Sequence, residues 1–179
     1  TGIGQGYIQT TPIQLCLMTA QIANGGYKIY PYILVGDDQK NQPADKYTPL
    51  YENSKNIRII KDAIFGSTNE VMGTSYKSRF DNPKYQFAGK TGTAQVKKIT
   101  ERDRELDLKT FEIPYEERDH ALYVAFGPYK NPRYALSVIV EHGGNGSTTA
   151  APMAKKLFKL IIDRHKIRQS MDDKRYLEI

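Results

Sequence analysis

The chain has 179 residues, 39% of them hydrophobic and 26% charged, which is the composition of one ordinary globular domain and not of a disordered or fibrous protein. Its apolar stretches are far shorter than the roughly 20 residues of a membrane span, and no signal peptide is visible. The 26 Lys and Arg residues exceed the 20 Asp and Glu residues, giving a formal charge of +6. Because the two signs alternate without a long basic run, we expect no nucleic-acid binding.

Neither cysteine nor histidine is arranged as a metal site. Cys16 is the only cysteine, so no internal disulfide can form, and its apolar neighbours favour a buried structural thiol. The three histidines are far apart in the sequence and show no zinc-type spacing. We therefore expect neither a metal nor a cofactor.

The first element in chain order is a helix with clear start and stop signals. Thr11 to Gln14 form a capping box with proline at the first helical position, and Asn24-Gly25-Gly26 is a typical stop. We expect a mostly buried helix from about Thr11 to Ala23. The following β-branched and aromatic run, Tyr27 to Val35, is interrupted by Pro31, which favours an extended edge segment or short hairpin over a central strand.

The middle of the chain alternates between loops and regular elements. Residues 36–56 are polar and contain prolines, so they predict a surface loop. Isoleucines at roughly helical spacing predict a helix over Ile57–Val71, and Tyr85–Val96 reads as a strand. The charge-dense excursion of residues 97–119 is either a functional lid or a solvated loop.

The last third predicts a hairpin and a helix. The runs Ala121–Phe126 and Tyr134–Val140 are joined by strong turn residues, which is typical of an antiparallel hairpin. A helix is expected from Thr148 or Thr149, with a charged tail over residues 164–179 that frays. Its core-facing stripe is predicted to consist of Met153, Leu157, Leu160 and Ile161. Together these elements predict an α+β fold with a mostly antiparallel sheet flanked by helices.

The most informative segment is Phe87–Val96, in which Lys90-Thr91-Gly92-Thr93 lies on the predicted strand. Gly89-Lys90-Thr91 also matches the end of a phosphate-binding P-loop, but that motif requires glycine where Lys84 stands, and a helix after Thr91. The residues that follow look extended, so nucleotide binding is excluded. Lys-Thr-Gly is instead one of the signatures of β-lactamases and penicillin-binding proteins.

Short sequence segments on both sides of this motif resemble those of a known family. They are Gly4-Gln5-Gly6-Tyr7 and the helix start at Thr11 before the motif, and Arg118-Asp119-His120-Ala121, Ala125–Tyr129 and Glu141–Gly144 after it. In this order they resemble the C-terminal half of the transpeptidase domain of class B penicillin-binding proteins, most closely the elongation type, penicillin-binding protein 2. The resemblance extends from Gly2 to about Asp163 and implies a partial penicillin-binding fold, shared with serine β-lactamases.

The resemblance assigns roles to the motif residues. The Lys90 ammonium would lie near the substrate carboxylate and the partner serine of a Ser-x-Asn motif, and the hydroxyls of Thr91 and Thr93 would donate to that carboxylate. The Thr93 backbone N–H would form half of an oxyanion hole. Gly89 and Gly92 would leave room for the substrate backbone beside the strand, or would only relieve crowding within it.

The nucleophile motif Ser-x-x-Lys of this family is absent. The seven serines are followed three residues later by Ile, Glu, Ser, Asp, Val, Ala and Asp, never by lysine. Ser54-Lys55-Asn56 satisfies Ser-x-Asn, but it lies on the wrong side of the Gly-Gln-Gly block, so we interpret it as a chance match. We expect the nucleophile half, a pedestal region and a membrane anchor in a missing N-terminal part, and the fragment alone to be inactive.

The implied parent is a D,D-transpeptidase that cross-links peptidoglycan stem peptides and is inhibited by β-lactams. The alternatives are a serine β-lactamase and a β-lactam-sensing or non-catalytic domain of the same fold. The resemblance implies a parent anchored in the inner membrane with this domain in the periplasm, working with other membrane cell-wall proteins. The fragment itself is expected to be soluble and to self-associate through apolar surface left uncovered. Because the sequence opens at Thr1, we expect a cut or designed N-terminus.

Overall fold

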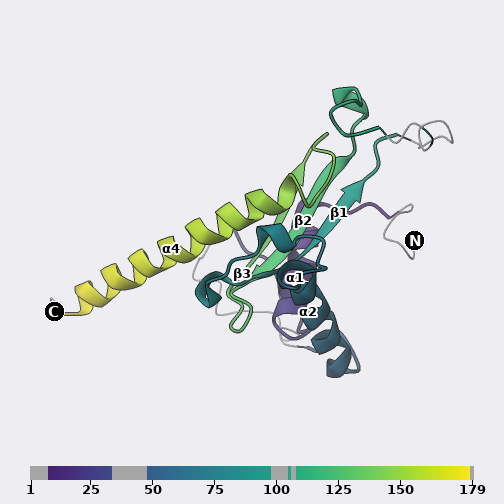
Figure 1. The fold of residues 1–179 in the computed structure, drawn as a ribbon. Coiled ribbons are helices and arrows are strands. Elements are labelled where there is room, and N and C mark those ends of the chain that lie inside the picture. The colour runs from purple at the N-terminus through teal and green to yellow at the C-terminus, as the bar shows by residue number, and fades with distance from the viewer. Residues whose placement is uncertain (1–7, 34–47, 98–104, 106–107, 178–179) are drawn as a thin grey trace.

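The computed structural model describes residues 8–33, 48–97, 105 and 108–177, with 165–177 described by their backbone alone. A three-stranded antiparallel sheet with the order β1-β2-β3 forms the centre (Figure 1). Its strands are β1 (Ala88–Ala94), β2 (His120–Gly127) and β3 (Tyr134–Val140). The helices are α1 (Pro12–Ala23), α2 (Ser54–Asn69) and α4 (Ala150–Leu177), with short 3-10 turns at Tyr76–Ser78, Pro83–Tyr85 and Tyr115–Glu117.

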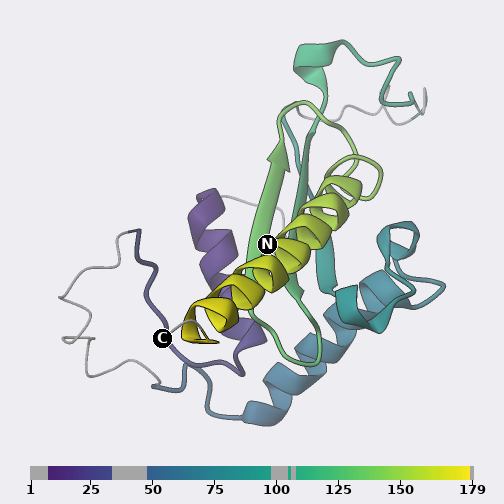
Figure 2. The ribbon, with the colours of Figure 1, turned by 90° about the vertical axis from the view of Figure 1, so that its left-hand side faces the viewer.

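Helices cover both faces of the sheet. Successive side chains of a strand point to opposite faces of the sheet. On β2, Tyr123 therefore points toward α4, and Phe126 points to the other face, where it packs in a second cluster with Ala23 of α1. Seen from the side, α4 crosses the front of the sheet, α1 lies beside it and α2 runs below (Figure 2). The predicted α+β class, an antiparallel sheet flanked by helices, is confirmed.

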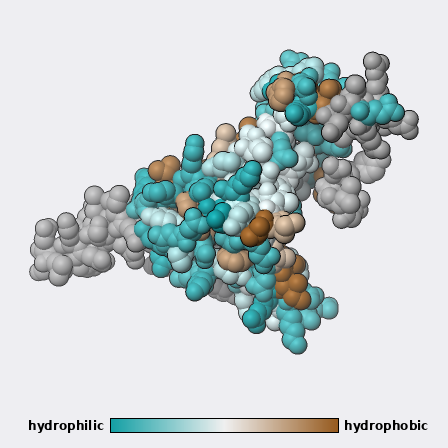
Figure 3. Space-filling view, in the orientation of Figure 1, coloured by the Kyte–Doolittle hydropathy of each residue, from teal (hydrophilic) through white to brown (hydrophobic). Residues whose placement is uncertain are grey.

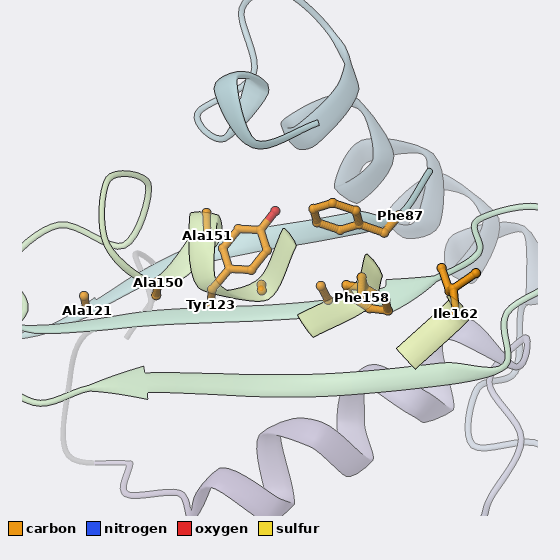
Figure 4. Close-up of a cluster of buried hydrophobic side chains, with 9 residues drawn as sticks. Phe87, Ala121, Tyr123, Ala150, Ala151, Phe158 and Ile162 are labelled. Carbon is orange, nitrogen blue, oxygen red and sulfur yellow. The ribbon is translucent and has the colours of Figure 1, made fainter. Parts of the chain in front are cut away.

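Aromatic rings and alanines form the larger core cluster (Figure 4). Phe87 stacks on Phe158 with 5.0 Å between ring centroids and meets Tyr123 edge-on at 6.4 Å. All three side chains are fully buried. Around them, α4 and β2 approach one another through small side chains, namely Ala121, Ala125, Ala150, Ala151 and Ala154.

The capping box of α1 is present as predicted, with Thr11 accepting from the Gln14 amide and the Gln14 side chain accepting from Thr11. The prediction of a mostly buried helix was wrong. Its buried residues are Thr19, Ile22 and Ala23, while Ile13 and Met18 are 58% and 42% exposed. The outer apolar face of α1 therefore has no partner among the described residues.

Two boundaries differ from the prediction in the middle of the chain. Helix α2 begins at Ser54, inside the expected loop, because Asn53 caps it by accepting from the Lys55 amide; residues 36–47 of that loop lie outside the described part. Strand β1 begins at Ala88, because Asn82 caps a 3-10 turn over Pro83–Tyr85 instead. The hairpin of β2 and β3 is confirmed.

The predicted stripe of α4 was wrong by about one residue. Met153, Leu157 and Leu160 are 45%, 43% and 66% exposed, and Ile161 is half-buried. The buried face consists instead of Ala150, Ala151, Ala154, Phe158 and Ile162. Helix α4 also continues to Leu177, where the charged composition predicted fraying. The exposed leucines and methionine are among the apolar residues scattered over a mostly hydrophilic surface, one face of which is shown in Figure 3.

The outer edge of β3 pairs with no other described strand. The Ser137 hydroxyl on this strand is buried without a hydrogen-bond partner among the described residues. Near the start of the chain, Tyr27 forms an isolated antiparallel bridge with Pro49, in agreement with the expected extended segment. In the described part of the chain, no helix has the length and apolar character needed to cross a membrane.

Candidate functional site

Strand β1 lies at one edge of the sheet that the described strands form, and its outer side carries the Lys-Thr-Gly-Thr residues. Gly89 turns both backbone groups away from β2: its N–H donates to the Thr68 hydroxyl at 3.0 Å, and its carbonyl accepts from that hydroxyl at 3.1 Å. Backbone groups alternate in direction along an antiparallel strand. Thr91 and Thr93, which have the same parity as Gly89, therefore direct their N–H and carbonyl groups toward the open edge.

The Lys90 side chain bends over this edge. Its exposed ammonium donates to the Thr91 carbonyl at 2.9 Å and to the Thr91 hydroxyl at 3.2 Å. The Thr91 hydroxyl is also 3.4 Å from that of Thr74, in the segment that follows α2. The edge thus combines an ammonium, hydroxyls and outward N–H groups, which are the donors that bind an extended ligand carrying a carboxylate and a polarised carbonyl.

A buried group of hydroxyls lies behind the motif. The hydroxyls of Thr68, Ser75 and Tyr123 are 3.0 to 3.2 Å from one another, and burial raises the pKa of Tyr123. A Cβ on Gly89 would lie 2.4 Å from the Tyr123 hydroxyl, so glycine is required here to let the Tyr123 side chain lie against the backbone of β1. Asn69 adds a hydrogen bond to the Phe87 carbonyl at 2.9 Å. The end of α2 therefore fixes the start of β1.

The other end of β1 is held by the residues of the Arg-Asp-His block. The Asp119 carboxylate accepts from the Val96 amide at 3.2 Å, and its carbonyl accepts from the Gly144 amide at 2.8 Å. The Nδ1 atom of His120 accepts from the His142 amide at 2.9 Å, and this supports the left-handed backbone of His142, whose φ is 54°. Asp119 and His120 thus lie at the end of the motif strand.

The loop before α4 supports the middle of the motif. A Cβ on Gly146 would lie 2.5 Å from the Leu122 carbonyl oxygen and 2.8 Å from that of Gly92. Only glycine allows this loop to lie so close to the backbone of β1 and β2. Gly92 itself has more room, since a Cβ there would meet the Leu122 Cβ at 3.3 Å.

Other candidates from the sequence lie apart from this edge. Ser54 is at the first turn of α2, while Thr68 at the far end of that helix touches β1. Fourteen residues at 1.5 Å each place Ser54 about 20 Å from the motif, which agrees with a chance Ser-x-Asn match. Cys16 is half-buried rather than buried, and its thiol donates to the Ala135 carbonyl at 3.5 Å. No group of three His, Cys, Asp or Glu side chains among the described residues could hold a metal ion.

No sequence pattern marked the supporting hydroxyls. Thr68, Thr74 and Ser75 lie in a polar stretch that reads as a helix end and a loop, and their distance to β1 in the sequence hides their contact with it. A weak signal was present in Gly89, because a glycine within a strand marks a close approach by another group.

Comparisons with known proteins identify the family of the chain. The family described as penicillin binding protein transpeptidase domain matches residues 1–159. The peptidoglycan D,D-transpeptidase MrdA of Salmonella typhimurium strain LT2 is 34% identical over 174 residues, which are 90% of this chain and 26% of that protein. MrdA of Escherichia coli strain K12 is 34% identical over 167 residues, 90% of this chain and 25% of that protein. The chain therefore spans about a quarter of these relatives.

Solved structures show the same likeness. PBP2 of Pseudomonas aeruginosa, in complex with WCK 5153, matches with a TM-score of 0.70 and 35% identity over 89% of this chain and 32% of that one. PBP2 of Helicobacter pylori, in complex with MreC, matches with a TM-score of 0.70 and 29% identity over 90% of this chain and 26% of that one. The resemblance seen in the sequence is thereby confirmed: the chain belongs to the penicillin-binding protein transpeptidase family, as part of its transpeptidase domain.

Proposed function

We propose that this chain is the C-terminal part of the catalytic domain of a peptidoglycan D,D-transpeptidase that acts through a serine acyl-enzyme. The curated relatives are peptidoglycan D,D-transpeptidases. The observation that carries the proposal is the direction of the β1 backbone, which follows from the two hydrogen bonds between Gly89 and Thr68. That direction turns the Thr93 N–H toward an open edge.

In this proposal the chain supplies one wall of the active-site cleft. The Lys90 ammonium attracts the terminal carboxylate of a stem peptide, or the carboxylate of a β-lactam, and the hydroxyls of Thr91 and Thr93 donate to it. The Thr93 N–H donates to the carbonyl oxygen that becomes negative as the serine attacks. The absence of a side chain at Gly92 lets the ligand backbone lie alongside the strand.

The reaction is an acyl transfer between two stem peptides. The serine, supplied by residues outside this chain, attacks the penultimate D-Ala carbonyl, and the terminal D-Ala leaves. An amine from a second stem peptide then attacks the ester and releases the serine. The Thr93 N–H stabilises the tetrahedral oxyanion in both steps, because each step places negative charge on the same oxygen.

We further propose that the rest of the domain docks where this chain is incomplete. The unpaired edge of β3 offers backbone groups for another strand, and the Ser137 hydroxyl on it lacks a partner in the described part of the chain. The exposed apolar residues of α1 and α4 flank this sheet. We place the parent in the inner membrane with this domain in the periplasm, as part of a membrane assembly that builds cell wall. Alone, the chain associates with copies of itself through these same surfaces.

A proline scan of the parent protein tests the oxyanion role. Thr93→Pro removes the proposed N–H donor and the Thr93 hydroxyl, but no hydrogen bond of the sheet, because that N–H faces the outer edge. The expected result is a loss of about 10²–10³-fold in the rate of acylation by a fluorescent penicillin. Thr91→Pro is the matched control, since it also removes a carboxylate-binding hydroxyl and an N–H of the same orientation, but one outside the oxyanion hole. Equal losses for both variants would refute the assignment.

The same assay separates the proposal from related activities. The isolated chain should remain unlabelled by penicillin, because it contains no Ser-x-x-Lys motif. In the parent, exchange of stem-peptide D-Ala indicates a transpeptidase. Rapid release of hydrolysed penicillin would indicate a β-lactamase, and stable labelling without exchange would indicate a sensing domain.

A further inference from the structure

A basic groove of about 580 Å³ lies between the first half of α4 and the 3-10 turn at Tyr76–Ser78. Its volume falls in the range of small-molecule sites. Four lysines line it, with Phe80 and Pro152 as an apolar floor. The lining residues include hydroxyls but no carboxylate; they are Lys77, Ser78, Phe80, Ser147, Thr148, Pro152, Lys155, Lys156 and Lys159.

The positive charge of this groove is largely uncompensated. Lys159 pairs with Asp163 at 2.8 Å, and the Lys155 ammonium lies 5.0 Å from the centre of the Phe80 ring. For Lys77, Lys155 and Lys156, the described residues provide no carboxylate partner. Like charges one turn apart on a helix repel one another, so the α4 lysines lower the stability of the free protein and favour a bound anion.

A nearly buried serine presents an unpartnered hydroxyl to the groove. Ser78 lines the groove and is only 3% exposed. Its backbone N–H donates to the Ser75 carbonyl at 2.8 Å, whereas its hydroxyl bonds to none of the residues that the structure describes. The Ser78 hydroxyl oxygen is not among the buried atoms without a partner, so it is accessible from the groove, where water or a ligand oxygen can bond to it.

We propose that this groove binds a phosphate-bearing ligand whose apolar portion packs on Phe80. Ammonium groups act as point charges that suit phosphate, and no guanidinium is present to select the planar geometry of a carboxylate. Three uncompensated ammonium groups match a phosphoryl group of charge near −2 better than they match a single carboxylate. The phosphate belongs either to a soluble ester or to the headgroup of a membrane lipid.

Titration of the 179-residue chain with phenyl phosphate tests the site by calorimetry, and the same titration of the parent provides a repeat in the complete domain. Lys155→Gln/Lys156→Gln is expected to weaken binding about tenfold or more, which corresponds to about 1.4 kcal/mol or more. Ser78→Ala is expected to weaken binding without lowering the unfolding temperature, because its hydroxyl has no protein partner to lose. Lys55→Gln/Lys109→Gln, with the same change in net charge on other surfaces, should bind as the unmodified chain does.

Two further arms identify the ligand and its source. Benzoate should bind more weakly than phenyl phosphate; equal or tighter binding would overturn the preference for phosphate. Phosphatidic acid vesicles carry a phosphate monoester like that of phenyl phosphate. If they bind the chain, with binding lost in the α4 double variant, the phosphate is assigned to a lipid, and binding of phenyl phosphate alone would assign it to a soluble ester. Failure of both probes, or equal losses in the α4 and control double variants, would overturn the site. None of these outcomes depends on acyl transfer at β1.

Discussion

Substitution of Gly89 by alanine tests how tightly the motif strand is packed against its support. The new Cβ would lie 2.4 Å from the hydroxyl oxygen of Tyr123 and 2.5 Å from two of its ring carbons. Tyr123 cannot move aside easily, because its side chain is fully buried and its hydroxyl lies within 3.0 Å of those of Thr68 and Ser75. The substitution therefore forces an overpacked core and displaces these hydrogen bonds.

The expected cost can be worked out from these contacts. Overpacking of a core typically costs about 1–3 kcal/mol, and the loss of one buried hydrogen bond adds about 1 kcal/mol. Gly89→Ala should therefore lower the free energy of unfolding by about 2–4 kcal/mol in a urea titration. Gly92→Ala, on the same strand, is the control: its Cβ meets the Leu122 Cβ at 3.3 Å and no buried ring, so its cost should stay below about 1 kcal/mol.

A double variant identifies the cause. If the Tyr123 ring is the obstacle, replacing it with leucine should remove most of the additional cost of Gly89→Ala, so that the two changes are not additive. Additive effects would refute the reasoning. So would a Gly89→Ala protein as stable as the Gly92→Ala protein.

Two further predictions concern α4. The Lys159 ammonium and the Tyr85 hydroxyl donate to the Asp163 carboxylate at 2.8 and 2.6 Å and hold the pKa of Asp163 well below its usual range. Because the folded-state pKa is lowered, the stabilisation is complete above the ordinary value of 3.8 and is lost as the pH falls toward the folded value. Asp163→Asn should therefore lower the unfolding temperature at pH 7, and the difference from the unmodified protein should shrink below about pH 4. A difference that stays constant with pH would contradict the ionic contact between Lys159 and Asp163. The second prediction tests which face of α4 is buried. Phe158→Ala should lower the free energy of unfolding by about 3–5 kcal/mol, whereas Leu160→Ala should change it by less than about 0.5 kcal/mol in the monomer. A larger loss for Leu160→Ala than for Phe158→Ala would instead support the stripe predicted from the sequence.

Local signals were sufficient for most of the secondary structure. The capping box at Thr11 marked the start of α1, and the turn residues between β2 and β3 fixed the hairpin, because each depends on neighbours in the chain. The buried face of α4 could not be predicted in the same way. Its contact with the sheet depends on alanines, and Ala150 or Ala154 carries too little hydrophobicity to outweigh Leu157 in a periodicity analysis.

The motif residues of the candidate site were predicted, but their support was not. Lys90 and Thr93 follow a motif that is contiguous in the sequence. Thr68 is more than twenty positions from Lys90 along the chain, and its hydroxyl meets Gly89 only once α2 packs along the edge of the sheet. Such a contact follows from tertiary packing, which the sequence pattern of either segment alone does not encode.

The close approach of Gly146 to the backbone of Gly92 bears on how the proposed cleft could admit a ligand. The motif strand has a rigid backing at its middle and is anchored near both ends, by Thr68 and by Asp119. In the proposed cleft, β1 would therefore be a rigid wall that does not move back when a ligand binds. Any widening for a larger ligand would have to come from the opposite wall.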